Sequence, residues 1–327
     1  MSTPPSAALA ADRAREERLE PFAADVRAGL LARPKSLPPR WFYDALGSAL
    51  FEAICRLPWY RITRAELSLL SRHGGEIAAR FGAQASIVEL GVGSGEKLST
   101  LVAAVAPRPL PRVHLIDVSP RALEMAAAVL APYEGLSIVT HEATYEEGLE
   151  RAAADRWGRQ VVLFLGSNLG NFDPAAAAGL VFRIAALSRP GDLLLLGLDL
   201  VKPEGELRLA YDDPLGVTAA FNKNVLQRMN AELGAEFDLA AFAHEARWDP
   251  AAGRVEMHLV SLRPQEVRVP GARLSVRFDR GESIWTESSY KFDLERIQAL
   301  AREAGLTIDA QWTDPDAAFA LTLLRKA

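Results

Sequence analysis

Three glycines stand at alternate positions directly after an apolar run, in the segment Glu89-Leu-Gly91-Val-Gly93-Ser-Gly95-Glu-Lys97. Glycine lets a backbone turn tightly and approach a ligand closely. A P-loop needs glycine directly before its lysine, but Glu96 intervenes and its carboxylate would repel a triphosphate. A dinucleotide-binding loop needs two residues between its second and third glycines, whereas one separates Gly93 from Gly95. The loop suits a phosphate-free cofactor with an amino acid end and a ribose; the alternative is a tight turn without a ligand.

A carboxylate ends the next apolar run: Asp117, 22 residues after Gly95. A carboxylate at this place can accept hydrogen bonds from both ribose hydroxyls of an adenosine. Ser119 and Pro120 predict the start of a helix, as its N-cap and its first residue. The glycine loop and Asp117 together predict an adenosine-containing ligand.

A further polar group follows the apolar run of residues 161–165, where the sequence continues as Gly166-Ser-Asn-Leu-Gly-Asn171. Ligands of open α/β sheets bind at the carboxyl ends of the strands. The amide of Asn171 could accept a hydrogen bond from an amine and orient it. Asn171 is alternatively a plain turn residue.

Short apolar runs alternate with amphipathic segments around these motifs, which is typical of βαβ units and a parallel sheet. The expected strands are Ser86–Leu90, Arg112–Ile116, Leu136–His141, Gln160–Leu165 and Asp192–Leu198. A helix at Leu294–Glu303 and strands at Thr307–Trp312 and Ala318–Leu324 are expected to complete the sheet edge. Leu19–Phe81 is expected to form several helices. The segment Glu206–Ile284 is expected to contain helices followed by two strands, at Arg254–Ser261 and Arg273–Phe278. These last two regions could form a lid.

The bulk composition narrows the class of protein. The formal charge of −5, from 37 basic and 42 acidic residues, argues against a nucleic-acid partner. The single cysteine, Cys55, rules out an internal disulfide, and the scattered histidines predict no metal site. The N-terminus lacks the pattern of a signal peptide, so we expect a cytoplasmic protein. The apolar stretch Asp192–Leu200 is too short to span a membrane, so we expect no membrane partner.

From about Leu37 to Leu324 the chain resembles the histidine Nα-methyltransferases of ergothioneine biosynthesis. The blocks that carry the resemblance are LPPRWFYDALGSALFE, LPWYRITRAE, ELGVGSGEK, IDVSPRALEMA, FLGSNLGNFDP, GLDLVK, AYDDPLGVTAAFNKNVLQRMNAELGAEFD, ARWD, RVEMHLVS, TESSYKF and WTDPDAAFAL. The implied fold is α/β: a class I methyltransferase with a Rossmann-like sheet and a second, smaller substrate-binding domain. The expected parts are a flexible arm (1–18), a helical part of the substrate domain (19–81), the Rossmann-like domain (82–203 and 285–327) and an inserted α+β segment (204–284).

The implied reaction is the transfer of up to three methyl groups from S-adenosyl-L-methionine to the α-amino nitrogen of free L-histidine, giving hercynine and S-adenosyl-L-homocysteine. The cofactor would be bound by Glu89, Gly91, Gly93, Gly95, Lys97, Asp117, Thr144 and Tyr145. The resemblance implies that Tyr43 and Asn171 hold the amino group as the catalytic pair, with Gly166 beside them. It places Tyr60 at the carboxylate end and Glu287 with Ser289 at the imidazole, with Tyr211 and Met257 as walls. No metal and a monomer are expected.

The implied imidazole contacts make chemical sense. A carboxylate and a hydroxyl can satisfy a neutral or a charged imidazole, and Glu287 and Ser289, two residues apart, would share one face of a strand. A sulfonium methyl is already activated, so positioning supplies most of the catalysis. The amine must lose its proton before transfer, and tyrosine faces and oxygens favour the positive charge that develops on it. Tyr43 is our candidate for this role.

Two blocks depart from the family pattern. Where the family usually carries Gly-Asp-Phe, this chain has Ala143-Thr144-Tyr145, and Thr144 is a weaker acceptor for the adenine amino group. The usual Tyr-Tyr-Pro-Thr-Arg is Tyr60-Arg-Ile-Thr-Arg64 here. Two alternatives stay open: methylation of another free amino acid such as tryptophan or tyrosine, and a non-catalytic partner that binds S-adenosylmethionine. Glu287 argues against an indole pocket, which would leave its carboxylate buried and unpaired.

Overall fold

The computed structural model describes residues 19–82, 84–105 and 111–327. The flexible arm expected at residues 1–18 lies outside the described residues. The chain divides into two compact units. We call Arg61–Lys202 with Ser289–Ala327 the sheet unit, and the chain up to Tyr60 with Pro203–Ser288 the insert unit.

The sheet unit contains a seven-stranded sheet in the order β12-β13-β6-β5-β2-β3-β4. The strands are β2 (Ala85–Leu90), β3 (Arg112–Asp117), β4 (Ser137–Glu142), β5 (Arg159–Phe164), β6 (Leu193–Asp199), β12 (Leu306–Asp314) and β13 (Phe319–Lys326). The strands β4, β3, β2, β5 and β6 pair in parallel, and β13 is antiparallel to both of its neighbours. Each of the first five predicted strands is confirmed to within one residue at either end. The predicted Rossmann-like α/β class is confirmed, with the chain reversing its direction of winding beside β2.

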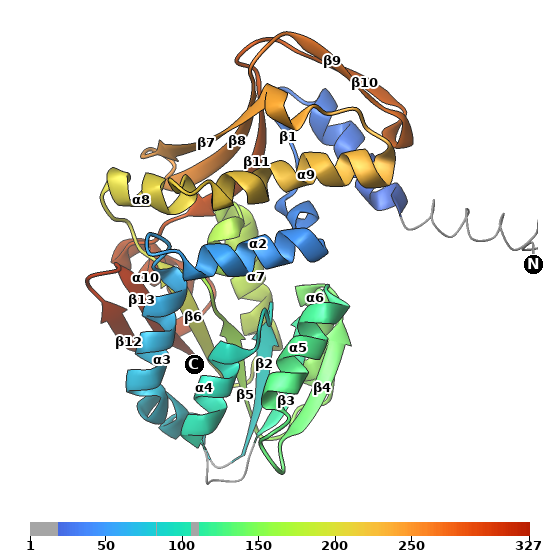
Figure 1. Ribbon diagram of the computed structural model, residues 1–327. Helices are drawn as coiled ribbons and strands as arrows, with labels where there is room; N and C mark the ends of the chain where they lie inside the picture. Colours follow the sequence, from blue (N-terminus) through green and yellow to red (C-terminus); the bar gives the residue numbers. More distant parts are fainter. Residues whose placement is uncertain (1–18, 83, 106–110) are drawn as a thin grey trace, which may run out of the picture. The chain divides into compact units, whose positions relative to one another are not determined.

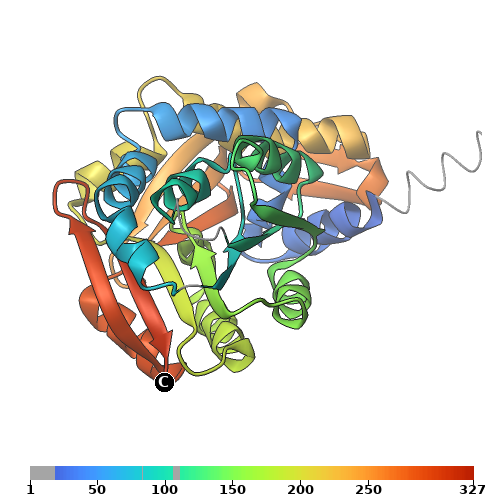
Figure 2. The same cartoon turned by 90° about the horizontal axis from the view of Figure 1, so that it is seen from below.

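Helices cover both faces of this sheet (Figures 1 and 2). They are α3 (Ile62–Ala79), α4 (Glu96–Val105), α5 (Pro120–Leu130), α6 (Tyr145–Ala154), α7 (Pro174–Leu187) and α10 (Leu294–Glu303). The helices α6, α7 and α10 share one core with β2, β5 and β6, whereas α3, α4 and α5 pack side by side in sequence order. Ser119 caps α5 and Pro120 is its first residue, as predicted.

The placement of α3 corrects the expected boundary of the substrate domain. The sequence predicts that residues 19–81 belong together, but α3 packs against α4, β12 and β13 and is part of the sheet unit. Its buried residues Leu70, Ile77 and Ala78 recur at helical spacing and face this unit's core. The expected boundary at residue 285 is also shifted, because the unit boundary falls after Ser288, within β11 (Ser283–Tyr290).

The insert unit combines a four-stranded sheet with helices. The sheet has the order β1-β11-β8-β7, formed by β1 (Lys35–Ser36), β11, β8 (Arg254–Ser261) and β7 (Phe242–Asp249). A separate hairpin contains β9 (Gln265–Val269) and β10 (Leu274–Phe278). The helices are one over residues 19–31, α2 (Ala45–Arg56), α8 (Glu204–Tyr211) and α9 (Val217–Leu233), with short 3-10 turns η1 (Pro39–Phe42), η3 (Leu239–Ala241) and η4 (Pro270–Ala272). The long helix α9 packs along α2 and against β7 and β8 (Figure 1).

Candidate functional site

The glycine loop connects β2 to α4 at the carboxyl edge of the parallel strands. Gly91, Gly93 and Gly95 all have positive φ, at 72°, 52° and 77°, a region that favours glycine. A Cβ on Gly95 would lie 2.7 Å from the Cα of Ala126, so this glycine also lets α5 approach the loop. A Cβ on Gly93 would meet nothing within 4 Å, so the loop is open at this position. The three glycines therefore have different roles.

Glu89, the next-to-last residue of β2, is a buried carboxylate beside this loop. Glu89 is 2% exposed, and its Oε2 atom has no hydrogen-bond partner among the described residues. Burial raises the pKa of Glu89 to about 8, with Lys97 opposing the rise and Glu66 and Asp117 adding to it. A buried acceptor without a partner is costly unless a ligand supplies the donor. The Glu89 carboxylate therefore fits the ammonium end of an amino acid-like cofactor.

Asp117 ends β3 one strand away and is fixed by the backbone. Its Oδ2 accepts a hydrogen bond from Val92 N at 3.1 Å, and its Oδ1 accepts one from Ser119 N at 2.9 Å. Burial raises the pKa of Asp117, and these backbone donors oppose the rise. Each carboxylate oxygen can accept a second hydrogen bond, so Asp117 retains the capacity to bind a pair of ribose hydroxyls.

Thr144 and Tyr145 begin α6 next to the loop. Thr144 is the N-cap, and its hydroxyl accepts a hydrogen bond from Glu147 N at 3.4 Å. A Cβ on Gly91 would lie 3.0 Å from the hydroxyl oxygen of Tyr145, so this phenol reaches the glycine loop. Its ring packs against Phe164, and burial raises its pKa, so it stays a neutral phenol. Tyr145 is thus brought to the cofactor loop, while the adenine contact of Thr144 stays a prediction.

Sequence reasoning missed Glu66, which connects two predicted site residues. Glu66 in α3 is fully buried, and both its carboxylate oxygens lie 2.9 Å from Gly166 N. Its Oε2 also lies 2.6 Å from Lys97 Nζ. Gly197 of β6 makes room for it, since a Cβ there would lie 1.8 Å from Glu66 Oε1. A glutamate within a helical segment gives no signal in the sequence that it is buried.

The segment after β5 brings Asn171 to the same edge of the sheet. Gly166 has a φ of 76°, and a Cβ on it would lie 2.9 Å from Lys97 Nζ. Asn171 is half-buried at the end of the 3-10 turn η2 (Asn168–Asn171). A Cβ on Gly170 would lie 2.6 Å from the carbonyl oxygen of Tyr290, so η2 packs closely on the end of β11. These contacts fix the backbone that carries Asn171.

Ser289, near the end of β11, lies in a buried charged network. It is 4% exposed, and its Oγ accepts a hydrogen bond from Lys291 Nζ at 2.8 Å. Lys291 is fully buried and pairs with Asp199 at 2.9 Å, and Asp199 also pairs with Lys202 at 2.6 Å. The Ser289 hydroxyl is therefore held in place, which is compatible with its predicted binding role without testing it.

The insert unit gathers three of the predicted substrate residues, all tyrosines, in an aromatic group. Ring centroids are 5.7 Å apart for Tyr43 and Phe51, 6.3 Å for Phe51 and Tyr60, and 6.2 Å for Tyr60 and Tyr211. Tyr60 and Tyr211 are 7% exposed, whereas Tyr43 is 39% exposed. Burial raises the pKa of Tyr60 well above its usual value, and the neighbouring Tyr211, Tyr43 and Glu287 add to the rise. Tyr43, Tyr211 and Glu287 thus all lie near Tyr60.

Met257 of β8 is 2% exposed in the same unit. Its carbonyl oxygen accepts a hydrogen bond from the Thr286 hydroxyl at 2.9 Å, which connects β8 to the strand of Glu287. The position agrees with a plain core residue, and the role of Met257 as a pocket wall stays a prediction.

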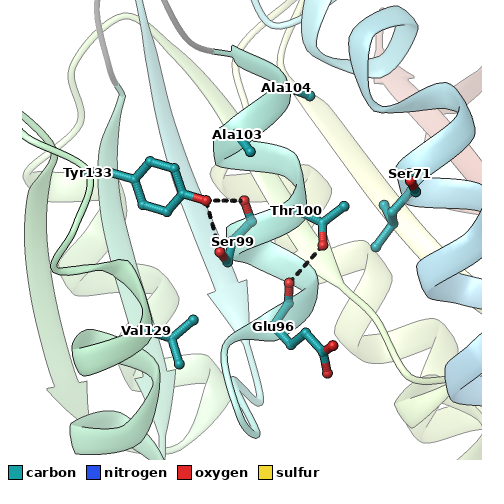
Figure 3. A pocket seen from close by; sticks show the side chains of 9 residues that line it. Ser71, Glu96, Ser99, Thr100, Ala103, Ala104, Val129 and Tyr133 are labelled. Carbon is teal, nitrogen blue, oxygen red and sulfur yellow. Dashed lines mark hydrogen bonds between the residues drawn. The ribbon is translucent and has the colours of Figure 1, made fainter.

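A pocket of about 510 Å³ lies elsewhere in the sheet unit, on the helices α3, α4 and α5 (Figure 3). Tyr133 contributes its ring to this pocket, and its hydroxyl lies 3.0 Å from Ser99 Oγ. None of the sequence-predicted site residues lines it, and its lining shows no buried polar atom without a partner. We therefore place the candidate site at the strand edge and not in this pocket.

The described part of the chain contains neither a metal-binding cluster nor a membrane-spanning helix. Residues 19–82, 84–105 and 111–327 contain no group of three or more His, Cys, Asp or Glu arranged to hold a metal ion. In the same ranges, no helix combines the length and the apolar character that crossing a membrane requires.

Comparisons with known proteins show the family of the chain. Residues 22–326 match the family model described as histidine-specific methyltransferase, SAM-dependent. The chain is 47% identical to a histidine N-alpha-methyltransferase of Mycolicibacterium smegmatis, over 96% of this chain and 97% of that protein. It is 45% identical to one of Mycobacterium tuberculosis, over 92% of this chain and 94% of that protein. An ergothioneine biosynthesis protein 1 of Neurospora crassa is 29% identical over 86% of this chain and 32% of its own length. The chain therefore belongs to the family of SAM-dependent, histidine-specific methyltransferases.

Proposed function

We propose that this protein transfers methyl groups from S-adenosylmethionine to the α-amino nitrogen of free L-histidine, up to the trimethylated betaine hercynine, as the first step of ergothioneine biosynthesis. The observation that carries the proposal is the buried Glu89 carboxylate beside an open glycine loop, in a chain nearly half identical to histidine N-alpha-methyltransferases.

The residues of the sheet unit fit S-adenosylmethionine. Glu89 would accept hydrogen bonds from its ammonium group, Lys97 would face its carboxylate, and Asp117 would bind the ribose hydroxyls. Tyr145 would pack beside the loop, with Thr144 near the adenine. The bound cofactor supplies a sulfonium methyl group that is already activated for displacement.

The remaining predicted residues would hold the amino acid. Tyr43 and Asn171 would bind the α-amino group and orient its lone pair, and Tyr60 would bind the carboxylate. Since burial keeps Tyr60 protonated, it can donate a hydrogen bond to an anionic oxygen. Methylation makes the nitrogen permanently cationic after the third transfer, and aromatic faces stabilise such a charge.

Incubation with S-adenosylmethionine and an equimolar panel of free amino acids tests the substrate. We expect mass spectrometry to find methylated histidine as the dominant product. A dominant product from tryptophan or tyrosine would support the alternative amino acid, and no product from any of them would support the non-catalytic partner.

Replacement of Tyr43 by phenylalanine tests the proposed acceptor contact. The Tyr43→Phe variant keeps the ring contacts with Phe51 but loses the hydroxyl. We expect kcat to fall about 100-fold, within the range typical of general acid–base groups, while the Kd of S-adenosylmethionine changes less than about twofold. Unchanged turnover would remove Tyr43 from the catalytic pair.

Glu287 is the residue that we expect to discriminate histidine from apolar amino acids. In Glu287→Gln the amide still bonds the imidazole but loses the charge, whereas Glu287→Leu leaves the ring unpaired. We expect the KM for histidine to rise about tenfold in the first and more than about 100-fold in the second. Equal effects on histidine and on the cofactor would contradict a role at the imidazole.

We also propose that the protein acts as a cytoplasmic monomer, without a metal ion and without a nucleic-acid partner. Activity is expected to persist after dialysis against a chelator, and light scattering is expected to give a mass near 35.5 kDa. A loss of activity that Zn²⁺ or Mg²⁺ restores would overturn the metal-free mechanism.

A further inference from the structure

The insert unit contains a buried chain of hydrogen bonds between Tyr211 and β11. Thr286 Oγ1 lies 2.7 Å from Asn222 Oδ1, and Asn222 Nδ2 lies 2.9 Å from His244 Nδ1. His244 Nε2 in turn lies 2.8 Å from the carbonyl oxygen of Tyr211. Asn222 is fully buried, Thr286 is 1% exposed, and the His244 side chain is 2% exposed. These buried hydrogen bonds thus connect α8, β7, α9 and β11.

Acceptor oxygens fix the directions of these hydrogen bonds. The Thr286 hydroxyl shares its one hydrogen between Asn222 Oδ1 at 2.7 Å and the carbonyl oxygen of Met257 at 2.9 Å. Asn222 Nδ2 also lies 3.2 Å from the carbonyl oxygen of His258, which only accepts, so this amide atom is the nitrogen. An amide nitrogen only donates, so His244 Nδ1 must accept. The carbonyl oxygen of Tyr211 also only accepts, so His244 Nε2 must carry the hydrogen. The geometry therefore requires a neutral His244 with its proton on Nε2.

Protonation of His244 would break the hydrogen bond with Asn222, because a proton on Nδ1 would face the amide donor of Asn222. The charged groups around the ring are Asp212, whose Oδ1 lies 3.9 Å from Nε2, together with Asp213 and Lys223. Burial lowers the pKa of His244 more than the two carboxylates raise it, and Lys223 adds to the lowering. The neutral form that the hydrogen bonds require is thus also the form that burial favours.

We propose that His244 is a positioning residue: its neutral Nε2–H form fixes Tyr211 to the strand of Glu287 and so sets the affinity for the amino acid substrate. The inference rests on the proposed function, since it gives Tyr211 and Glu287 a part in substrate binding. Thr286 directly precedes Glu287 in β11, and the Tyr211 ring lies 6.2 Å from that of Tyr60. A displaced α8 would therefore disturb the aromatic group, and a displaced β11 would disturb Glu287.

Two substitutions at His244 separate positioning from folding. His244→Gln keeps an acceptor oxygen and a donor nitrogen at similar spacing but does not titrate, whereas His244→Leu has neither. We expect the KM for histidine to rise about tenfold in His244→Leu, with the Kd of S-adenosylhomocysteine unchanged, and to return to within about threefold of wild type in His244→Gln. His73→Leu, on α3 of the sheet unit, is the matched control. It is expected to change neither the KM for histidine nor the Kd of S-adenosylhomocysteine.

Below neutral pH the KM for histidine of the wild type, divided by that of His244→Gln, is expected to rise, because only the wild type can protonate His244. The substrate histidine titrates equally in both measurements, so its titration cancels in this ratio. A ratio that does not change with pH would overturn the positioning role. Equal changes in KM, kcat and cofactor affinity in His244→Gln and His244→Leu would also overturn it.

Nitrogen chemical shifts of the His244 ring, assigned against His244→Gln, test the tautomer without any turnover. We expect a protonated Nε2 and an unprotonated Nδ1 at neutral pH. A charged ring or the Nδ1–H tautomer would overturn the inference. If instead these shifts agree but histidine is not methylated, then it is the proposed function that fails.

Discussion

Glu89→Gln is expected to abolish the proton release that accompanies cofactor binding. With a pKa of about 8, the Glu89 carboxyl is mostly protonated at pH 7 in the free protein, whereas a bound ammonium group requires the carboxylate. Binding at pH 7 should therefore release up to about 0.9 proton from this group. Calorimetric titrations with S-adenosylhomocysteine in two buffers of different ionisation enthalpy measure this release.

The pH dependence gives the same prediction a second readout. Wild-type affinity should increase from pH 6 toward pH 8, while the glutamine variant should lack this component, and the comparison cancels the ligand's own titration. At pH 9 we expect the variant to bind about 10- to 100-fold more weakly than wild type, as for a lost hydrogen bond to a charged group. At pH 6 the two should converge. The exposed neighbour Glu96→Gln is the control and should behave as wild type. Identical pH profiles of wild type and Glu89→Gln would contradict the role of Glu89.

The raised pKa of Glu89 also predicts how the stability of the free protein changes with pH. Because the folded-state pKa lies above the unfolded value of 4.5, the folded chain binds more protons between these two values. This group therefore lowers the stability of the free protein progressively as the pH rises from about 4.5 to 8. Saturating cofactor should reduce this pH dependence, as thermal unfolding with and without ligand can show.

Glu66→Ala is expected to have the largest effect on stability. The substitution leaves Gly166 N without its acceptor and removes a buried carboxylate that pairs with the Lys97 ammonium group. Breaking a buried ion pair by removing one partner costs about 3–5 kcal/mol. Denaturant unfolding should show this loss. As a control, Glu150→Gln removes one partner of the exposed pair with Arg183 and should cost less than about 1 kcal/mol.

Two further variants test whether Glu66 also acts on the cofactor site. Glu66→Gln keeps an acceptor for Gly166 N but removes the charge next to Lys97, so it should fold and bind S-adenosylhomocysteine about tenfold more weakly. Gly197→Ala leaves the charge but places a methyl group where Glu66 Oε1 lies, so it should displace the carboxylate. Wild-type cofactor affinity in both variants would limit Glu66 to a structural role.

Much of the sheet unit could be predicted because its signals are local. The buried parallel strands are predominantly apolar, so their bounds follow closely from residue type. Gly91, Gly93 and Gly95 are recognisable by spacing, and Asp117 by its place at the end of the next strand. The observed strand order then brings these positions to one edge.

The rest depends on contacts between residues distant in sequence. The burial of Glu66 requires Gly166, which follows β5, and the space beside Gly197 in β6, and no periodicity predicts either. The membership of α3 in the sheet unit is of the same kind, since its apolar face would suit any core. His244 of β7 was missed because three other elements, α8, α9 and β8, contribute the atoms that fix its tautomer.

The most direct test is a mass spectrum of L-histidine after incubation with the purified protein and S-adenosylmethionine that carries a deuterated methyl group. We predict histidine with up to three labelled methyl groups, all on the α-amino nitrogen, as fragmentation can show. Label on an imidazole nitrogen would contradict the proposed placement of the amine, and unlabelled histidine at saturating cofactor would contradict the proposed function.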